Sequence, residues 1–261
     1  MSIITLTTDL GNKDHYVAII KAEIYKQIPK ANIIDISHEI SKFDIQEAAF
    51  IFKNCYKNFP EGTIHVIGVN EELHSNTQHI AIEINNQYII GPDNGLFSLI
   101  FNETLPDKIV EINITQDTDD LTFATKDIFI KVACHIARGG TLEMIGNIIP
   151  EFKNKRSSLN PVIDQETVKG IIIYIDTYGN AISNIDEDLF KKIGAGREFS
   201  ILYGRGNEEL KKIHEKYQDV PEGERIALFG TNKLLQISMN KGKASELLGL
   251  HQFDIIRIEF K

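Results

Sequence analysis

The sequence contains no tryptophan and only two cysteines among its 261 residues. Cys55 and Cys134 stand far apart, outside any CxxC spacing and away from histidines that would complete a zinc-ligand pattern. Neither a disulfide framework nor a metal site is therefore expected, and the chain suits a reducing cytoplasm.

Positive charge is also scarce, because 28 lysines and arginines face 37 aspartates and glutamates, for a formal net charge of −9. Surfaces that bind nucleic acid through its phosphates carry clustered lysine and arginine, so a nucleic-acid partner is not expected. No apolar run approaches the length of a membrane span, and the first residues enter a predicted strand without a basic leader. We expect a cytoplasmic protein that is neither exported nor embedded in a membrane.

Several common catalytic signatures are missing. The sequence has no GxGxxG, GxxxxGK[ST], GxSxG or HExxH motif, which excludes the commoner nucleotide, hydrolase and zinc mechanisms. The histidines are scattered: His74 and His79 flank a polar loop and are expected to be solvated, and His135 is expected to be partly buried in an apolar helix. No cofactor is predicted.

The first 140 or so residues alternate between two hydrophobic patterns. Runs rich in isoleucine and valine at 3–7, 32–36 and 63–69 read as strands, and residues 15–27 and 44–58 have the period of helices, the second capped by an aspartate at its start. This alternation is typical of βαβ units. With a hairpin turn predicted farther on, at Asn85-Asn86, it predicts a mixed, mainly parallel sheet with helices.

Turn-forming residues collect between positions 140 and 166, where the periodic patterns fade. We therefore predict an N-terminal α/β domain over residues 1–155 and a smaller C-terminal domain over 156–261. The runs in the second half are short and strand-like, which predicts an antiparallel β-barrel or sandwich. These runs are residues 168–176, 199–203, 225–229, 234–239 and 253–260.

Asp9 follows the first predicted strand and precedes Gly11. This position places a carboxylate at the carboxyl edge of a parallel sheet, where such folds leave a ligand crevice, and a carboxylate can accept both hydroxyls of a ribose diol. Alternatively, Asp9 only caps the turn into the helix that begins near His15. The polar residues around Tyr16 lie at that helix start, where free backbone N–H groups favour an anion.

Two later turn clusters also carry polar side chains. Residues 91–96 (GPDNGL) favour a structural turn, with Asn94 as a candidate pocket wall. A hairpin turn would explain the glycine and asparagine at the end of residues 176–180 (DTYGN), but it would not need the acid and the aromatic residue before them. Asp176 and Tyr178, together with the amide of Asn180, offer an ammonium partner, a stacking face and a hydrogen bond to an adenine edge.

Four blocks in this order, residues 7–11 (TTDLG), 35–40 (DISHEI), 91–96 and 176–180, resemble the S-adenosylmethionine hydroxide adenosyltransferase family. That family includes adenosine-forming hydrolases and the related fluorinase and chlorinase. The likeness covers essentially the whole chain. It implies a larger α/β domain, a smaller β domain, and a homotrimer in which the first domain of one subunit and the second domain of its neighbour share each S-adenosylmethionine pocket.

The resemblance also implies substrate-binding roles for residues of the first domain. Asp9 would bind the ribose hydroxyls, and Tyr16 would lie near the methionine carboxylate. Phe43 falls where the family often places a pocket side chain, and Phe123 would line the ribose.

In the second domain the resemblance implies five further contacts. Asp176 would take the methionine ammonium, Tyr178 would stack on adenine, and Asn180 would read the adenine edge. Thr231 and Asn232, in a block that resembles the family's last pocket strand and loop, would close the carboxylate and adenine side.

The sequence departs from the family where its hydrolases carry their catalytic residues. Their Asp-Pro-Gly-Val-Gly loop and following arginine align with residues 70–74 (NEELH) and Thr77, so the catalytic aspartate becomes Asn70. Their catalytic histidine becomes Ala124, and Thr125 stands where they have glycine. All three catalytic identities have changed.

Three hypotheses follow. The family reaction displaces methionine from the ribose C5′ of S-adenosylmethionine, and because a sulfonium is an activated leaving group, orienting and desolvating the water is most of the task. The first hypothesis is a diverged hydrolase in which Asn70, Thr77 and Thr125 position the water. The second is a protein that binds S-adenosylmethionine or adenosine without turnover, and the third is use of another nucleophile, such as halide.

Two acids follow Asn70 directly. Glu71 and Glu72 could act as a displaced general base, but exposed acids in a polar loop usually belong to a solvated surface. The sequence favours the solvated loop.

Overall fold

The computed structural model describes residues 2–72, 77–102, 104–114, 122–204, 206 and 208–261. The chain separates into two compact units, Met1–Ser158 and Leu159–Lys261. Among the described residues, no helix combines the length and the apolar character needed to cross a bilayer.

Within the described residues, the first unit contains a seven-stranded sheet with the order β2-β1-β3-β5-β4-β6-β7. The pairs from β2 to β5 are parallel, and the pairs from β5 through β4 and β6 to β7 are antiparallel. The expectation of a mainly parallel sheet therefore holds for only half of it. The strands are β1 (Ile3–Thr8), β2 (Asn32–Ser37), β3 (Ile64–Gly68), β4 (His79–Ile84), β5 (Gln87–Pro92), β6 (Lys108–Ile112) and β7 (Gly146–Ile148).

A tight turn explains the change of strand direction. Asn85 and Asn86 join β4 to β5 with φ angles of 50° and 57°, the left-handed conformation that the predicted two-residue hairpin requires. Once β4 runs antiparallel to β5, β6 and β7 extend the same antiparallel half.

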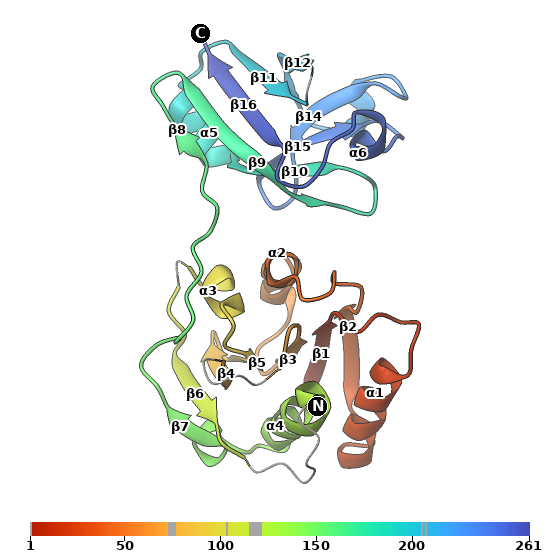
Figure 1. Cartoon of the computed structure of the whole chain (residues 1–261), viewed down its shortest axis with the longest axis vertical. Coiled ribbons are helices and arrows are strands. Elements are labelled where there is room, and N and C mark those ends of the chain that lie inside the picture. The colour runs from red at the N-terminus through yellow and green to blue at the C-terminus, as the bar shows by residue number, and fades with distance from the viewer. Residues whose placement is uncertain (1, 73–76, 103, 115–121, 205, 207) are drawn as a thin grey trace. The chain divides into compact units, whose positions relative to one another are not determined.

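Helices cover both faces of this sheet (Figure 1). One core cluster joins α1 (Tyr16–Gln27) and α4 (Ile130–Ala137) to the sheet through residues such as Leu6 and Val66, and a second cluster packs α2 (Ile45–Lys53) and α3 (Leu96–Ile100) on the opposite face. The alternation of side chains along each strand divides the sheet between these two clusters.

The ends of two helices bear on the site. Asp44 caps α2 as predicted, because its side chain accepts hydrogen bonds from the backbone N–H groups of Gln46 (2.9 Å) and Glu47 (3.0 Å). The helix ends at Lys53, earlier than predicted, and is followed by the 3-10 turn η1 (Tyr56–Asn58). A π-helical turn, η2 (Thr125–Phe129), leads into α4, and such turns are frequent at functional sites.

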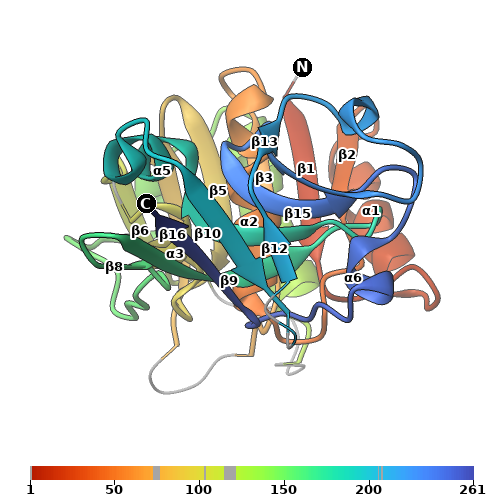
Figure 2. The same ribbon diagram turned by 90° about the horizontal axis from the view of Figure 1, so that it is seen from above.

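Within the described residues, the second unit forms a nine-stranded sheet with the order β12-β11-β16-β9-β10-β15-β14-β13, and β8 also pairs with β9. All of its pairs are antiparallel except β13 with β14. The strands curl around one apolar core into a nearly barrel-shaped sheet (Figure 1, Figure 2). They are β8 (Val162–Ile163), β9 (Thr167–Ile175), β10 (Ala181–Asp186), β11 (Phe199–Tyr203), β12 (Glu208–Leu210), β13 (Ile213–His214), β14 (Arg225–Phe229), β15 (Leu234–Met239) and β16 (Ile255–Phe260), with helices α5 (Glu187–Gly194) and α6 (Ala244–Leu247).

Candidate functional site

The carboxyl ends of β1, β3 and β5 lie side by side and bring polar loops together. Thr8 pairs with Gly68 in the parallel register, and the backbone N–H of Asp9 donates to the Gly68 carbonyl at 3.4 Å. The loop that follows β3 carries Asn70, and the loop that follows β5 carries Asn94. This edge is where open α/β sheets bind ligands.

Asp9 is held by the loop before α2. Its Oδ2 accepts a hydrogen bond of 2.9 Å from the backbone N–H of Phe43, and the Lys42 ammonium contacts its backbone carbonyl oxygen. Helix α1 begins at Tyr16, with His15 at the N-cap position and no capping side chain. Asp9 therefore does not cap that helix. Asp9 is buried, with 8% of its surface exposed, and the hydrogen bond from Phe43 orients its carboxylate.

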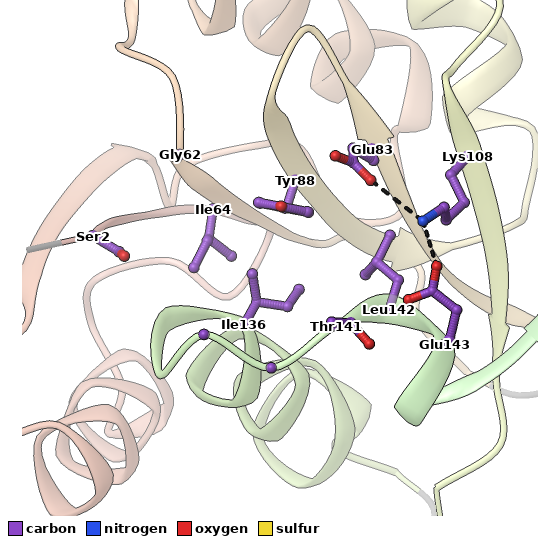
Figure 3. A pocket seen from close by; sticks show the side chains of 12 residues that line it. Ser2, Gly62, Ile64, Glu83, Tyr88, Lys108, Ile136, Thr141, Leu142 and Glu143 are labelled. Atoms are coloured by element: carbon purple, nitrogen blue, oxygen red, sulfur yellow. Dashed lines mark hydrogen bonds and ion pairs between the residues drawn. The ribbon is translucent and has the colours of Figure 1, made fainter.

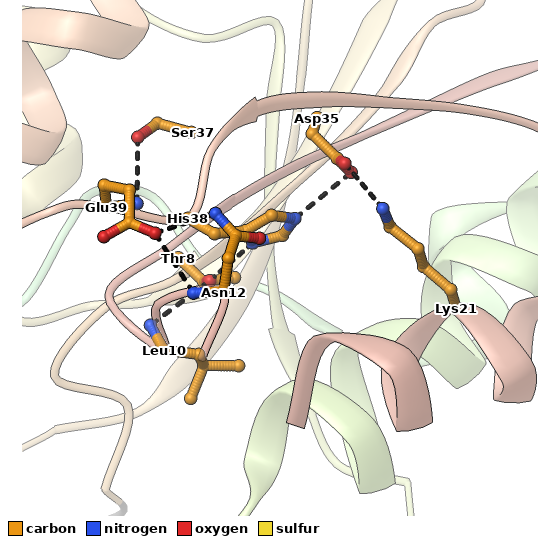
Figure 4. A network of polar contacts seen from close by, with 8 residues as sticks. All are labelled: Thr8, Leu10, Asn12, Lys21, Asp35, Ser37, His38 and Glu39. Atoms are coloured by element: carbon orange, nitrogen blue, oxygen red, sulfur yellow. Dashed lines mark hydrogen bonds and ion pairs between the residues drawn. The ribbon is translucent and has the colours of Figure 1, made fainter. Parts of the chain in front are cut away.

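A chain of polar contacts fixes the end of β1 behind Asp9 (Figure 4). The Thr8 hydroxyl lies 2.8 Å from Nδ1 of His38, whose Nε2 lies 3.1 Å from Asp35, and Asp35 contacts the Lys21 ammonium at 2.5 Å. Burial acts to raise the pKa of Asp35, but its contacts with Lys21 and His38 outweigh burial and hold that pKa below its ordinary value. Thr8 and His38 are themselves buried, so this chain supports the site rather than facing a ligand.

The loop after β3 is braced from β5. Asn70 is exposed and adopts a left-handed φ of 49°. The side-chain amide of Asn94 donates to the carbonyl oxygens of Val69 (3.1 Å) and Asn70 (3.0 Å), while its Oδ1 accepts from the backbone N–H of Leu96 at 3.2 Å. Asn94, which the sequence suggested as a pocket wall, is thus the brace that sets the Asn70 loop.

Glu71 overturns the expectation of a solvated acidic loop. It is half-buried, and its Oε2 accepts a hydrogen bond of 2.9 Å from the Thr125 backbone N–H as well as one from the Thr125 hydroxyl. Burial raises the pKa of Glu71 to about 7, because the hydrogen bonds from Thr125 only partly offset desolvation and the charge of Asp9 adds to it. Glu72 is exposed, as expected.

Gly68 makes room for this pair. A Cβ atom at position 68 would lie 2.0 Å from the Thr125 hydroxyl oxygen and 3.1 Å from Oε2 of Glu71. Any larger residue would therefore push apart the end of β3 and the start of η2.

The other predicted residues of the first unit differ in burial and in their partners. Thr125 is fully buried beside Glu71, and Thr77 is half-buried just before β4. The Tyr16 ring meets the Phe123 ring edge-on, with centroids 5.6 Å apart, so the structure brings these two predicted pocket residues together. Phe43 is 69% exposed. His74 lies outside the described residues, while His79, expected to be solvated, is buried, and its Nε2 lies 2.9 Å from the Glu71 carbonyl oxygen.

The second unit contains a hollow of about 1040 Å³ within its own strands and loops. It collects all five residues predicted there. They are Asp176, Tyr178, Asn180, Thr231 and Asn232.

Asp176 organises the turn at the mouth of this hollow. Its Oδ1 accepts from the backbone N–H groups of Tyr178 (3.0 Å) and Asn180 (2.9 Å), and its Oδ2 accepts from the Asn180 side-chain amide at 2.7 Å. Asn180 is buried, whereas Tyr178 is 79% exposed and leaves its ring open to a stacking partner.

Tyr217 and Gln236 also line this hollow and were not predicted from the sequence. Tyr217, in the 3-10 turn η4 (Tyr217–Asp219), accepts a hydrogen bond of 2.6 Å from the Gln236 side-chain amide. Its oxygen also lies 3.5 Å from the Asn180 amide nitrogen, which links η4 to the turn after β9. An isolated tyrosine in a charged stretch gives no local signal, and only the curled sheet brings it to Asn180.

A second hollow of about 470 Å³ lies at the amino ends of β1 and β3, opposite the edge that carries Asp9 (Figure 3). Lys108 dominates its polar lining and contacts both Glu143 and Glu83, the latter at 3.8 Å. The hydrogen bond from Lys108 lowers the pKa of Glu143 to about 2. The charges here are satisfied within the protein.

No group of three or more histidine, cysteine, aspartate and glutamate side chains within the described residues is placed to hold a metal ion. Cys134 is buried in α4, where burial raises the pKa of its thiol to about 11, and burial likewise raises the pKa of Cys55. Thiols with raised pKa values are poor nucleophiles at neutral pH.

Comparison with known proteins matches both units. The family model of the SAM hydroxide adenosyltransferase N-terminal domain matches residues 4–146. The family model of the SAM hydroxide adenosyltransferase C-terminal domain matches residues 170–257. A protein of Methanocaldococcus jannaschii named (R)-S-adenosyl-L-methionine hydrolase is 30% identical over 99% of this chain and 96% of its own length. A protein of the same name from Thermus thermophilus is 26% identical over 96% of this chain and 97% of its own length.

Two further comparisons extend this picture. A fluorinase of Nocardia brasiliensis is 25% identical but covers only 74% of this chain and 74% of its own length. A solved structure from Thermotoga maritima superposes with a TM-score of 0.87 at 30% identity, covering 99% of each chain. The fold and its order of elements are therefore shared along the whole chain.

Proposed function

Because the chain belongs to the S-adenosylmethionine hydroxide adenosyltransferase family, we propose that it hydrolyses S-adenosylmethionine to adenosine and L-methionine. The observation that carries this proposal is the full-length likeness to relatives named as hydrolases of S-adenosyl-L-methionine, at up to 30% identity over 99% of the chain. The likeness to fluorinases is more partial, at 74% of the chain. The reaction takes only water as its second reactant and needs no cofactor.

The proposed substrate contacts divide between the two units. Asp9, oriented by the backbone of Phe43, accepts the ribose hydroxyls, and the Tyr16 and Phe123 rings flank the sugar and the methionine carboxylate. A carboxylate that accepts charge-assisted hydrogen bonds contributes more than a neutral acceptor, which makes Asp9 the main anchor of the ribose.

In the second unit, Asp176 takes the methionine ammonium and Tyr178 stacks on adenine through its exposed ring. Asn180 reads the adenine edge, and Thr231 and Asn232 close the hollow around the base and the carboxylate. The Asn side-chain amide has an N–H donor and a carbonyl acceptor. These can pair with a ring-nitrogen acceptor and the amino donor on the edge of adenine.

The chemical step is a displacement at C5′. The water oxygen bonds to C5′ as the C5′–S bond breaks, its electron pair stays on sulfur as methionine leaves as a neutral thioether, and one proton is released. Asn70, Thr77 and Thr125 orient the water, so the site acts by alignment and by excluding bulk solvent.

One observation favours a second candidate, a protein that binds S-adenosylmethionine or adenosine without turnover. Asn70, Thr77 and Ala124 stand where the resemblance places the catalytic aspartate, arginine and histidine of the hydrolases. An amide cannot accept a proton at neutral pH, so these changes remove a proton acceptor from that position.

Incubation of the purified protein with S-adenosylmethionine, followed by chromatography of the nucleosides, separates the candidates. Adenosine released above the uncatalysed rate supports hydrolysis. If calorimetry shows that adenosine binds but no adenosine is formed from S-adenosylmethionine, the second candidate, a binding protein, is supported. If added chloride yields 5′-chloroadenosine, halide is the nucleophile.

We also propose a homotrimer in which the first unit of one subunit and the second unit of its neighbour hold each substrate. The proposal rests on the family resemblance. Size-exclusion chromatography with light scattering tests this proposal. We expect the measured mass to be that of about three chains of 29.5 kDa each.

A further inference from the structure

Glu71 stands at the same sheet edge as the proposed ribose anchor. It follows β3 by three residues, Asp9 follows β1 directly, and the two strands are parallel neighbours with Thr8 opposite Gly68. The negative charge of Asp9 is close enough to raise the pKa of Glu71. A ribose bound by Asp9 would therefore lie near the Glu71 carboxylate.

The Glu71 side chain is fixed rather than solvated. The Thr125 backbone N–H and hydroxyl both donate to its Oε2, and Gly68 leaves the space in which this contact forms. Thr125 sits where the resemblance places a glycine next to the hydrolases' histidine, and its hydroxyl supplies one of the two hydrogen bonds that hold Glu71. A carboxylate ordered by two donors on one oxygen can direct its other lone pairs at a reacting water.

On these grounds we propose that Glu71 is the general base of this protein, accepting the proton of the attacking water in place of the residues that have changed at Asn70 and Ala124. The inference rests on the proposed hydrolysis. As the water oxygen bonds to C5′ and the C5′–S electron pair passes to sulfur, the Glu71 carboxylate takes one water proton and later releases it to solvent. Thr125 is the positioning residue that holds the base.

Titratable groups approach Glu71 from three sides, and of these Asp9 contributes to its raised pKa. Asp9 faces it from the end of β1, His79 contacts its backbone from β4 with Nε2 2.9 Å from the carbonyl oxygen, and Lys126 and Asp127 beside Thr125 pair with each other at 2.9 Å. Burial raises the pKa of Glu71 to about 7, which suits a base that must be ionised at neutral pH and still bind a proton strongly. Burial also lowers the pKa of His79, which favours its neutral form near Glu71.

The test compares Glu71→Gln with Glu72→Gln, a matched change at the exposed neighbouring acid. Glu71→Gln keeps the size of the side chain but removes the proton acceptor, so we expect kcat to fall by about 100-fold or more while the Kd for adenosine changes by about twofold or less. In the wild type kcat rises with pH through about 7 as Glu71 ionises, and this rise disappears in Glu71→Gln. Glu72→Gln keeps the wild-type kcat and pH profile.

Three outcomes are decisive. If Glu71→Gln turns over with the wild-type kcat and pH profile, this inference is wrong while the proposed hydrolysis stands. If the wild-type protein releases no adenosine, both fail together. If Glu71→Gln does not bind adenosine, Glu71→Asp is the second variant: partial recovery of kcat with a shifted pH profile supports the base, and full activity with an unchanged profile overturns it.

Discussion

The hydroxyl of Thr8 lies 2.8 Å from Nδ1 of His38. Thr8 directly precedes Asp9, the aspartate proposed to hold the ribose. The other ring nitrogen of His38 lies 3.1 Å from Asp35, so one buried imidazole ties the end of β1 to β2. Because Asp9 is the next residue after Thr8, this contact supports the backbone that carries Asp9, while the Phe43 N–H orients the carboxylate itself.

His38→Ala is expected to weaken substrate binding and lower stability together. Removing the ring takes the 2.8 Å imidazole partner from the buried Thr8 hydroxyl and one contact from the exposed Asp35, and the loss of the buried contact costs about 1–3 kcal/mol. The KM for S-adenosylmethionine should rise more than kcat falls, because Asp9 positions the ribose rather than the water. Thermal unfolding and steady-state kinetics measure both effects. His251→Ala, at a largely exposed histidine, is the control and should leave both unchanged.

Asp9→Asn is expected to weaken adenosine binding by about 10-fold or more, the loss typical of a charged hydrogen-bond acceptor. A ribose contact predicts a sharper result. The wild type should bind 2′-deoxyadenosine more weakly than adenosine, and Asp9→Asn should bind the two nearly equally. Calorimetry with both nucleosides measures this coupling, and Asp14→Asn at an exposed acid is the matched control. Undiminished discrimination in Asp9→Asn would place the ribose elsewhere.

Tyr217→Phe removes the hydroxyl that joins Gln236 and Asn180 while keeping the ring. The Gln236 amide, in a residue that is 4% exposed, then loses a partner at 2.6 Å. We expect the affinity for adenosine to fall by about fivefold to 20-fold, as for one lost buried hydrogen bond. Calorimetry measures it against Tyr25→Phe, an exposed tyrosine of the other unit. Equal affinities in all three proteins would mean that the Tyr217 hydroxyl does not support Asn180 in adenosine binding.

Regular local patterns predicted much of the fold. The runs at 199–203, 225–229 and 234–239 are β11, β14 and β15 without any shift, and the Asp44 cap is confirmed. These elements carry continuous apolar patterns or a cap with a local mechanism, so the sequence around them contains what decides their structure.

The elements that were missed depend on distant partners. β10 reads as a mixed polar stretch, yet Ser183 is buried in it because its hydroxyl donates to the Leu235 carbonyl of β15 at 2.8 Å. Glu71 looked like a surface acid for the same reason, since Thr125, which holds it, lies 54 residues away. Periodicity cannot report a contact that only the folded sheet creates.

The last prediction concerns the response of stability to acid. His65 is fully buried, with Nδ1 2.7 Å from the Thr5 hydroxyl and Nε2 3.4 Å from Oε1 of Gln87. Burial lowers the pKa of His65 to about 4, although the contact with Gln87 opposes this shift. Below pH 6.5 the unfolded chain takes up a proton at this histidine that the folded chain does not accept until about pH 4. His65 therefore removes stability as the pH falls through this window, by a total on the order of 3 kcal/mol.

His65→Gln removes the titrating group, so its free energy of unfolding should fall less steeply between pH 6.5 and about 4 than that of the wild type. Urea unfolding followed by circular dichroism at a series of pH values measures the two slopes. The difference between slopes isolates His65, because the shifted carboxylates contribute equally to both proteins. His251→Gln, at the largely exposed histidine, should reproduce the wild-type slope. Parallel slopes for wild type and His65→Gln would mean that the imidazole is protonated in the folded protein, and that the Thr5 and Gln87 oxygens hold it as a cation.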